Sequence, residues 1–294
     1  MAAFFLLRPP PGRTNILVLG AAGKGYTGGD LTDTLIFLSF DHQTGKTLVL
    51  SLPRDIWIPA LRTKLNSVYH YQGMEGTKKV VGEILNQPVH YGLLINFDVF
   101  TQIIDTLGGV EVEVERSFDD YKYPLPGREN DTCGGDPDYK CRYEHIHFDA
   151  GLQHMDGERA LKYVRSRFAE GEEGTDFARS QRQQRFLVAI KNKILSPSIL
   201  FNLKIPLQLI KVVTANLETD VPQEKYLDFV KLALKFRSEN LWMEVLDENR
   251  LVTPPPSKVK YDEQWVLIPR TGDWGEIQEY VACLIEEGRK CQNR

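Results

Sequence analysis

The sequence predicts a layered fold of the α/β or α+β class. Continuous β-branched and apolar runs of strand length recur along the chain, among them 14–20, 34–40 and 47–52. Segments in which apolar residues have helical spacing lie between such runs, and 176–195 is the longest of them. Strands interleaved with helices are typical of a sheet covered by helices. The 294 residues, of which 42% are hydrophobic, are sufficient for a large buried core.

The amino-terminal part predicts three strands around a glycine-rich loop. Residues 14–20, "TNILVLG", form an apolar run that ends in glycine, as buried strands often do. The runs 34–40 and 47–52 flank the polar turn "DHQTGK" and predict a hairpin. The loop "GAAGKGYTGG" is not a P-loop, because no Gly-Lys-Ser/Thr sequence opens a helix there.

The next segments predict two helices and two strands. Residues 76–85 have helical spacing, and 90–97 form an apolar run of strand length. Residues 98–109 predict a helix that two glycines stop. The run 110–115, "VEVEVE", alternates with a period of two and predicts a half-exposed strand.

Residues 117–150 lack sustained periodicity and predict a long irregular excursion. The four cysteines of the chain form two closely spaced pairs, Cys133 with Cys141 and Cys283 with Cys291. No Cys-x-x-Cys is present, so a zinc site that includes His145 and His147 lacks the usual ligand spacing. We expect two local disulfides formed in an oxidising compartment, although three pairings exist in principle.

The carboxyl-terminal part predicts mainly helices. Asp156 is placed to cap a helix over 157–164, and Thr175 or Asp176 begins a long helix that reaches about residue 195. The remaining expected elements are helices over 204–216 and 223–236, a strand over 264–269 and a last helix over 273–288. No internal repeat or interdomain linker is evident, so we expect 14–294 to form a single domain.

The first thirteen residues and the net charge indicate whether the protein is attached to a membrane or binds nucleic acid. Residues 1–13, "MAAFFLLRPPPGR", predict a remnant or linker after an N-terminal membrane anchor, and a disordered terminus is the alternative. No run reaches the roughly 20 apolar residues that span a bilayer. The net charge of −4 argues against general nucleic-acid binding, which usually shows as a basic surplus.

A cluster of arginines predicts an anion site. The stretch "YVRSRFAEGEEGTDFARSQRQQ" places Arg165, Arg167, Arg179 and Arg182 around the carboxylate Asp176. Guanidinium groups so close together repel one another unless a strong anion lies between them, and a planar guanidinium suits phosphate oxygens. The alternative is a solvated surface on which the arginines pair with nearby glutamates.

The helix that begins at Asp176 places polar groups at its start and apolar groups along its length. Asp176, Arg179 and Gln183 lie on one face, at the helix N-terminus that favours anions. The same stripe continues into Leu187, Ile190 and Ile194. Arg182 and Arg185 point away from this stripe, and we expect them on the surface.

Two further motifs contain charged groups next to strands. Arg54 and Asp55 follow a strand directly, where α/β proteins place ligand-binding residues. Asp30 and Asp33 lie at the mouth of the glycine-rich loop, with Asp33 immediately before a buried strand. Each is either a turn residue or a carboxylate for a hard metal such as Mg²⁺ bound to phosphate.

The ordered set of motifs resembles the LytR-CpsA-Psr family of extracellular, membrane-anchored bacterial enzymes. The motifs are "DLTDTLIFLSFDHQTGKTLVLSLPRDIWI", "KLNSVYHYQG", "FDVFTQIIDTLGGVEV", "MDGERALKYVRSR", "DFARSQRQQ" and the ending "WVLIPRTGDWGEIQEYV". The resemblance runs from about Asn15 through Leu195 and includes that ending. It implies an α/β fold with a mixed central β-sheet flanked by helices in three layers. It also implies transfer of a glycopolymer from a polyprenyl-pyrophosphate carrier to peptidoglycan through a phosphodiester, at the extracellular face of the membrane.

The resemblance assigns roles to individual residues. It implies that the pyrophosphate is held by Arg54, Arg165, Arg167, Arg179 and Gln183. It places Asp176 at an acidic position of the site and Asp33 as a ligand of Mg²⁺ or Mn²⁺. The lipid is expected along Leu187, Ile190 and Ile194.

The chain departs from the family pattern after its first strand. Many members have an Asp there, in a Gly-x-Asp arrangement, where this chain has Gly20, Ala21 and Ala22. One metal ligand is therefore missing, or Asp30 replaces it. The base that accepts the proton is open between Asp55 and Asp176. The alternatives to a transferase are a polyprenyl-pyrophosphate pyrophosphatase and a non-catalytic protein that binds polyprenyl phosphate or glycan. Whether the polymer is a teichoic acid, a capsule or of arabinogalactan type is also open.

Overall fold

The computed structural model describes residues 12–26, 28–194, 196–200, 204–205, 208–209, 211–212, 217–226, 228–229 and 240–291. The contacts between Cα atoms divide the chain into two compact units. The sheet unit comprises 1–21, 30–94 and 218–294, and the hairpin unit comprises 22–29 and 95–217. A compact unit need not fold alone, so the single domain over 14–294 stays a prediction.

The sheet unit contains a mixed six-stranded sheet, with the strand order β11-β6-β1-β2-β3-β12. The strands are β1 (Arg13–Ala21), β2 (Thr32–Asp41), β3 (Thr47–Leu52), β6 (Tyr91–Ile95), β11 (Glu218–Thr219) and β12 (Leu241–Val245). The neighbours of β2 are both antiparallel to it, whereas β12 runs parallel to β3. The predicted mixed sheet and its first three strands are therefore confirmed, and β12 was not predicted.

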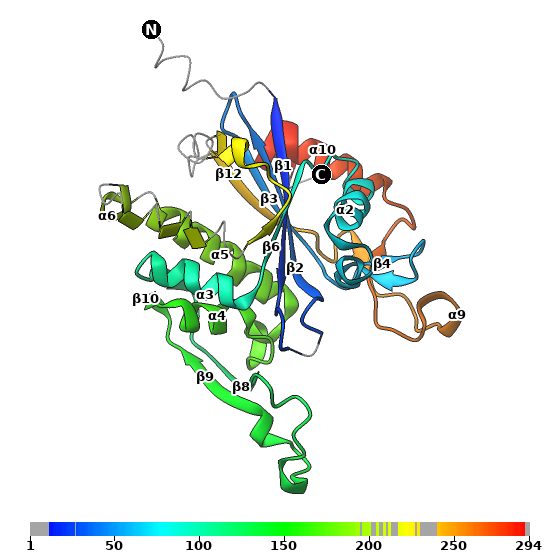
Figure 1. The fold of residues 1–294 in the computed structure, drawn as a ribbon. Coiled ribbons are helices and arrows are strands. Elements are labelled where there is room, and N and C mark those ends of the chain that lie inside the picture. The colour runs from blue at the N-terminus through cyan, green and yellow to red at the C-terminus, as the bar shows by residue number, and fades with distance from the viewer. Residues whose placement is uncertain are drawn as a thin grey trace. The chain divides into compact units, whose positions relative to one another are not determined.

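Helices α2 (Leu65–Leu85) and α10 (Gly275–Glu287) cover the same face of this sheet (Figure 1). Alternate residues of β1 and β2, such as Leu17 and Phe37, face Val81 of α2 and Val281 of α10 in one buried cluster. The sequence predicted only the second half of α2. Gly73, with φ of 63°, breaks the helix internally and so interrupts the helical spacing before residue 76.

Short pairs of strands complete the sheet unit. They are β4 (Trp57–Ile58) with β5 (Thr63–Lys64), and β13 (Leu251–Val252) with β14 (Ile268–Pro269). A one-turn helix, α9 (Lys258–Tyr261), lies between β13 and β14 in the chain. The predicted strand over 264–269 is thus reduced to β14.

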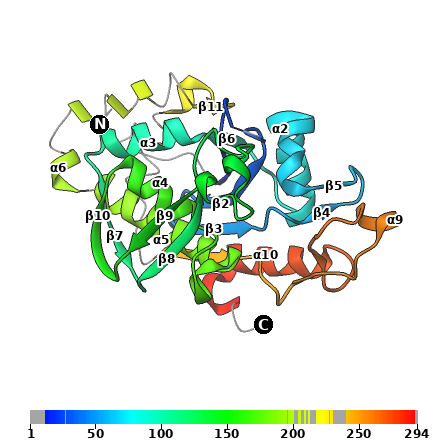
Figure 2. The ribbon, with the colours of Figure 1, turned by 90° about the horizontal axis from the view of Figure 1, so that it is seen from below.

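The hairpin unit packs helices against two strand pairs (Figure 2). Its helices are α3 (Phe97–Thr106), α4 (Gly157–Arg165), α5 (Asp176–Ile194) and α6 (Pro197–Leu200). Its strand pairs are β7 (Val110–Val114) with β10 (Gly151–Met155), and β8 (Phe118–Pro124) with β9 (Tyr143–Phe148). Asp156 caps α4 as predicted, because its carboxylate accepts from the backbone N–H of Arg159 at 2.8 Å.

The prediction of an irregular segment over 117–150 was wrong at both ends. Strands β8 and β9 pair there as an antiparallel hairpin, which extends beyond the helices of its unit in Figure 1. Their register shifts between Asp120 and Tyr123, and this shift removes the period of two that marks a strand in sequence. The disulfides Cys133–Cys141, between β8 and β9, and Cys283–Cys291, at the end of α10, are both present as predicted.

The helices predicted over 204–216 and 223–236 lie largely outside the described residues. Residues 223–225, which are described, form a 3₁₀ turn. In the described part of the chain, no helix combines the length and the apolar character that crossing a membrane requires.

Candidate functional site

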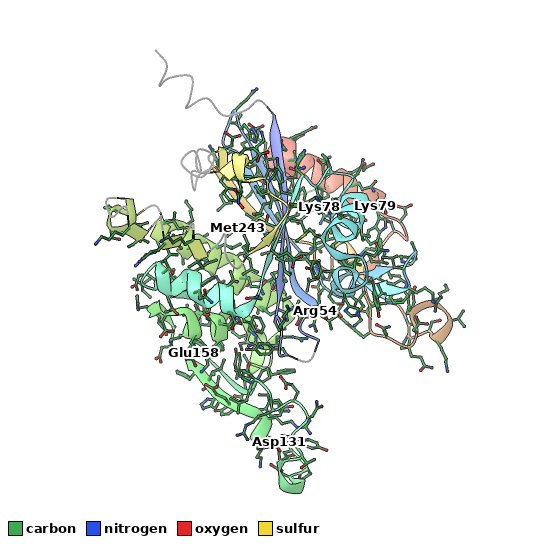
Figure 3. The ribbon with its side chains drawn as sticks, in the orientation of Figure 1. Arg54, Lys78, Lys79, Asp131, Glu158 and Met243 are labelled. Atoms are coloured by element: carbon green, nitrogen blue, oxygen red, sulfur yellow. A yellow bond between two sulfur atoms is a disulfide. The ribbon has the colours of Figure 1, made fainter. Side chains whose placement is uncertain are left out.

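Arg54 lies in a chain of alternating charges in the sheet unit (labelled in Figure 3). Its Nη1 donates to Asp33 Oδ1 at 2.6 Å, and its Nε donates to Asp55 Oδ2 at 3.3 Å. The other oxygen of Asp55 accepts from Lys64 Nζ at 2.7 Å. Asp55 is buried, whereas the Asp33 side chain is exposed. Asp55 therefore anchors Arg54 on its buried side, while Asp33 contacts it on the solvent side.

The local fold explains why these groups meet. The backbone N–H of Asn66, in the first turn of α2, donates to the carbonyl of Arg54 at 3.0 Å. The carbonyl of Asn66 in turn accepts from Thr32 Oγ1 at 3.1 Å, at the start of β2. The loop after β3, the start of β2 and the start of α2 are thus tied together. Asp33 is the second residue of β2, so it lies inside the strand that it was predicted to precede.

The carboxylates predicted to hold a metal have suitable chemistry for Mg²⁺. Asp33 and Asp30 are both exposed, and carboxylate oxygens are ligands that Mg²⁺ prefers. Asp30 hydrogen-bonds to the imidazole of His70, which holds the pKa of Asp30 below its usual range. In the described part of the chain, the groups of three whose ligand atoms converge each include two disulfide-bonded cysteines, so neither suits a metal. The residues present fit a metal held by one carboxylate together with substrate phosphate oxygens.

Arg165 is fixed by aromatic side chains in the hairpin unit. Its guanidinium lies 3.9 Å from the ring centroid of Phe97, and its Nη1 donates to the hydroxyl of Tyr123 at 2.8 Å. Stacking occupies a face of the guanidinium, and its N–H groups point outward in its plane. Arg165 is half-buried, so it is held in one orientation without being enclosed.

The start of α5 lies against the end of α4. Gln183 donates from Nε2 to the carbonyl of Val164 at 3.3 Å, one residue before Arg165. Arg179 lies in the first turn of α5 and is buried. Thr175 caps this helix by accepting from the backbone N–H of Ala178 at 3.0 Å. The structure therefore brings Arg165, Arg167, Arg179 and Gln183 to the junction of α4 and α5.

Four predicted site residues stand apart from those at the junction of α4 and α5. Asp176 is the first residue of α5, and its side chain lies outside what the structure describes. Arg54, Asp33 and Asp30 belong to the sheet unit, whereas the other predicted anion ligands belong to the hairpin unit. The roles assigned to all of these residues stay predictions.

The prediction that Arg182 lies on the surface was wrong. Arg182 is 1% exposed and donates to the carbonyls of Tyr163 and Ser166 and to Glu173. Burial lowers the pKa of Arg182, and the Glu173 carboxylate opposes that effect. Its donors are engaged by the protein, so Arg182 supports the site and does not face the anion. Arg185, also predicted on the surface, is half-buried and pairs with Glu115.

The apolar stripe of α5 is only partly open. Ile190 packs against the core of the hairpin unit, as Phe100 does, and Leu187 is half-buried. Ile194 is 36% exposed. The lipid-contacting role of these three residues stays a prediction.

Sequence reasoning missed the groups that hold the arginines in place. Phe97 and Tyr123 contact Arg165, and Asp120 accepts from the backbone of Arg167. The sequence gave no signal for Tyr123 or Asp120, since both lie in a stretch without periodicity. Tyr123 and Asp120 lie on β8, which pairs with β9, whereas Phe97 is the first residue of α3.

Known proteins are similar to this chain in sequence and in fold. The profile of the LytR_cpsA_psr family matches residues 9–278. The polyisoprenyl-teichoic acid–peptidoglycan teichoic acid transferase TagV of Bacillus subtilis (strain 168) is 27% identical over 236 residues, which are 77% of this chain and 54% of TagV. The transferase TagU of Bacillus cereus is 26% identical over 74% of this chain and 63% of TagU. The chain thus spans less than two thirds of the length of these relatives.

Solved structures confirm the fold class. The crystal structure of B. subtilis TagV has a TM-score of 0.67 at 23% identity, over 94% of this chain and 98% of that one. A structure of TagT bound to LI-WTA has a TM-score of 0.61 at 21% identity, over 92% of this chain and 89% of that one. The predicted α/β fold with a mixed sheet is therefore confirmed. Because the family profile covers nearly the whole sequence, the chain belongs to the LytR_cpsA_psr family.

Proposed function

We propose that this protein is a phosphotransferase that moves a glycopolymer from a polyprenyl-pyrophosphate carrier to peptidoglycan through a phosphodiester bond. The observation that carries the proposal is the fixed orientation of arginines at the family's motif positions. Arg54 is anchored by buried Asp55, and Arg165 is stacked on Phe97. The names of TagV and TagU, both teichoic acid transferases, favour a teichoic-acid-type polymer.

The reaction requires charge stabilisation more than covalent chemistry. A glycan hydroxyl attacks the phosphorus that bears the glycopolymer, a new O–P bond forms, and the bond to polyprenyl phosphate breaks. Negative charge on the nonbridging oxygens is stabilised by Arg54, Arg165, Arg167 and Arg179. Gln183 donates a further hydrogen bond. A Mg²⁺ or Mn²⁺ ion held by Asp33, or by Asp30, would neutralise part of the phosphate charge.

The proton of the attacking hydroxyl requires a base. Both oxygens of Asp55 accept from cationic side chains, Arg54 and Lys64. This arrangement suits an anchoring role and favours Asp176, at the helix N-terminus, as the base.

The location of the protein is part of the same proposal. Two disulfides are typical of proteins that fold in an oxidising compartment. We propose that the protein acts at the extracellular face of the bacterial cytoplasmic membrane.

The test is incubation of the purified protein with a labelled polyprenyl-pyrophosphate saccharide, Mg²⁺ and peptidoglycan oligomers. We expect label on the glycan, and a large loss of label with Arg179→Ala. Arg128→Ala is the matched control, because Arg128 is an exposed arginine paired with Asp131 in the loop after β8. Cleavage that does not depend on the glycan would instead show a pyrophosphatase. Binding without turnover would show a carrier-binding protein.

A further inference from the structure

Ser166 lies between two predicted anion ligands, Arg165 and Arg167, and is itself 1% exposed. Its hydroxyl donates to Asp120 Oδ2 at 2.7 Å. Its carbonyl accepts from Arg182 Nη2 at 2.6 Å. A buried carboxylate and a buried guanidinium therefore both hold the residue that lies between the two arginines.

Asp120 fixes more than the serine. It is 0% exposed, and its Oδ2 also accepts from the backbone N–H groups of Arg167 and Phe168, both at 3.2 Å. Its Oδ1 accepts from the backbone N–H of Lys122 at 2.9 Å. One carboxylate of β8 thus binds three donors in the segment after α4. Hydrogen bonds to an ionised acceptor are stronger than those between neutral groups, so this segment is firmly held.

Arg182 holds the same segment from α5. Its Nε donates to the backbone carbonyl of Tyr163, near the end of α4, at 3.2 Å. Its Nη1 donates to the carboxylate of Glu173, in the loop before α5, at 2.6 Å. Burial lowers the pKa of Arg182, the Glu173 carboxylate opposes this effect, and the charge of Asp120 opposes it more weakly. A largely buried ion pair such as Arg182 with Glu173 often adds less stability than an apolar core of equal volume. Its presence here suggests a role in geometry.

We infer that Asp120 and Arg182 are positioning residues, which set the backbone at 166–168 so that Arg165 and Arg167 meet the pyrophosphate of the carrier together. This inference rests on the proposed function. A pair of anion ligands must be placed within a fraction of an ångström, and a segment between a helix and a loop does not keep such precision unaided. Hydrogen bonds to both the side chain and the carbonyl of Ser166 remove that freedom.

The experiment is calorimetric titration of the full chain with inorganic pyrophosphate, below the melting temperature of every variant. Asp120→Asn keeps the side-chain volume but replaces one carboxylate oxygen, which accepts hydrogen bonds, with an NH₂ group, which can only donate them. We expect it to raise the Kd by about tenfold or more. Asp119→Asn is the matched control, because Asp119 is the adjacent residue and its partly exposed carboxylate contacts His145 and His147. We expect this control to bind as the wild type does.

Ser166→Ala decides the outcome if Asp120→Asn does not fold. It removes one hydroxyl and leaves the backbone contacts, so we expect a folded protein whose Kd rises several-fold. The two substitutions combined should cost less than the sum of their separate effects, since they remove the same hydrogen bond. Wild-type Kd values in the folded Asp120→Asn and Ser166→Ala variants would overturn the inference. A wild-type protein that does not bind pyrophosphate would instead contradict the proposed anion site, and the inference with it.

Discussion

At the scale of single residues, Arg54 and Arg165 are held in orientation by different partners. Arg54 bridges a buried and an exposed carboxylate, Asp55 and Asp33. Arg165 lies on the ring of Phe97 and donates to Tyr123. The sequence predicted both arginines as ligands from their motifs. It did not predict Phe97 or Tyr123, because a contact between side chains so distant in the chain leaves no local pattern.

The stacking of Arg165 predicts that lysine cannot replace it. Arg165→Lys keeps the charge but loses the planar group that stacks on Phe97, so we expect the rate of transfer to fall by about ten- to a hundredfold. Initial rates with the labelled carrier measure this effect. Arg128→Lys is the control, and equal rates for the two variants would contradict an orienting role for the aromatic rings.

The burial of Asp55 predicts a loss of stability. Asp55→Asn leaves Lys64 and Arg54 without their shared anion, so we expect the free energy of unfolding to fall by about 3 kcal/mol. Urea denaturation measures it. Asp33→Asn changes an exposed carboxylate and should cost less than about 1 kcal/mol. If the two variants were equally stable, Asp55 would not anchor Arg54.

At the scale of elements, helices with side-chain caps were predictable and the β8–β9 hairpin was not. Asp156 and Thr175 mark the starts of α4 and α5 in the sequence, and their hydrogen bonds are present. The strands β8 and β9 are hidden by a register shift and by charged residues on both sides of the turn. The start of α2 was missed because Gly73 breaks its periodicity.

The junction of α4 and α5 depends on one buried guanidinium. Arg182→Met removes the donors to Tyr163 and Ser166 and leaves Glu173 unpaired, so we expect a loss of about 3 kcal/mol in the free energy of unfolding. Arg185→Met is the control on the same helix and should change it by less than about 1 kcal/mol, since the Arg185 pair with Glu115 is partly exposed. Thermal melts of both variants measure this difference. A higher melting temperature for Arg182→Met than for Arg185→Met would contradict the supporting role of Arg182.

At the scale of the whole molecule, the predicted site residues fall in both compact units. Asp33 and Arg54 come from the sheet unit, and the arginines around α5 come from the hairpin unit. Spacing alone assigns them no common role, because they are more than one hundred residues apart in the sequence. The common role is implied only by the resemblance to the family. The mixed sheet followed from the same resemblance, whereas the division of the chain into two compact units had no sequence signal.

The proposed metal predicts a specific loss of response. Chelation should lower transfer, and added Mg²⁺ should restore it in the wild type. Asp33→Ala should respond weakly to Mg²⁺, because the carboxylate that would hold the ion is gone. A full response to Mg²⁺ in that variant would show that Asp33 does not hold the ion and serves only to contact Arg54. Asp30→Ala would then test the other candidate carboxylate.

The mass of the peptidoglycan oligomer after reaction tests the central claim most directly. Phosphodiester transfer predicts a gain equal to the saccharide plus one phosphate, with polyprenyl phosphate as the second product. A gain of saccharide without phosphate would show glycosyl transfer. Free saccharide phosphate with an unchanged oligomer would show hydrolysis, and either result would contradict the proposed phosphotransferase.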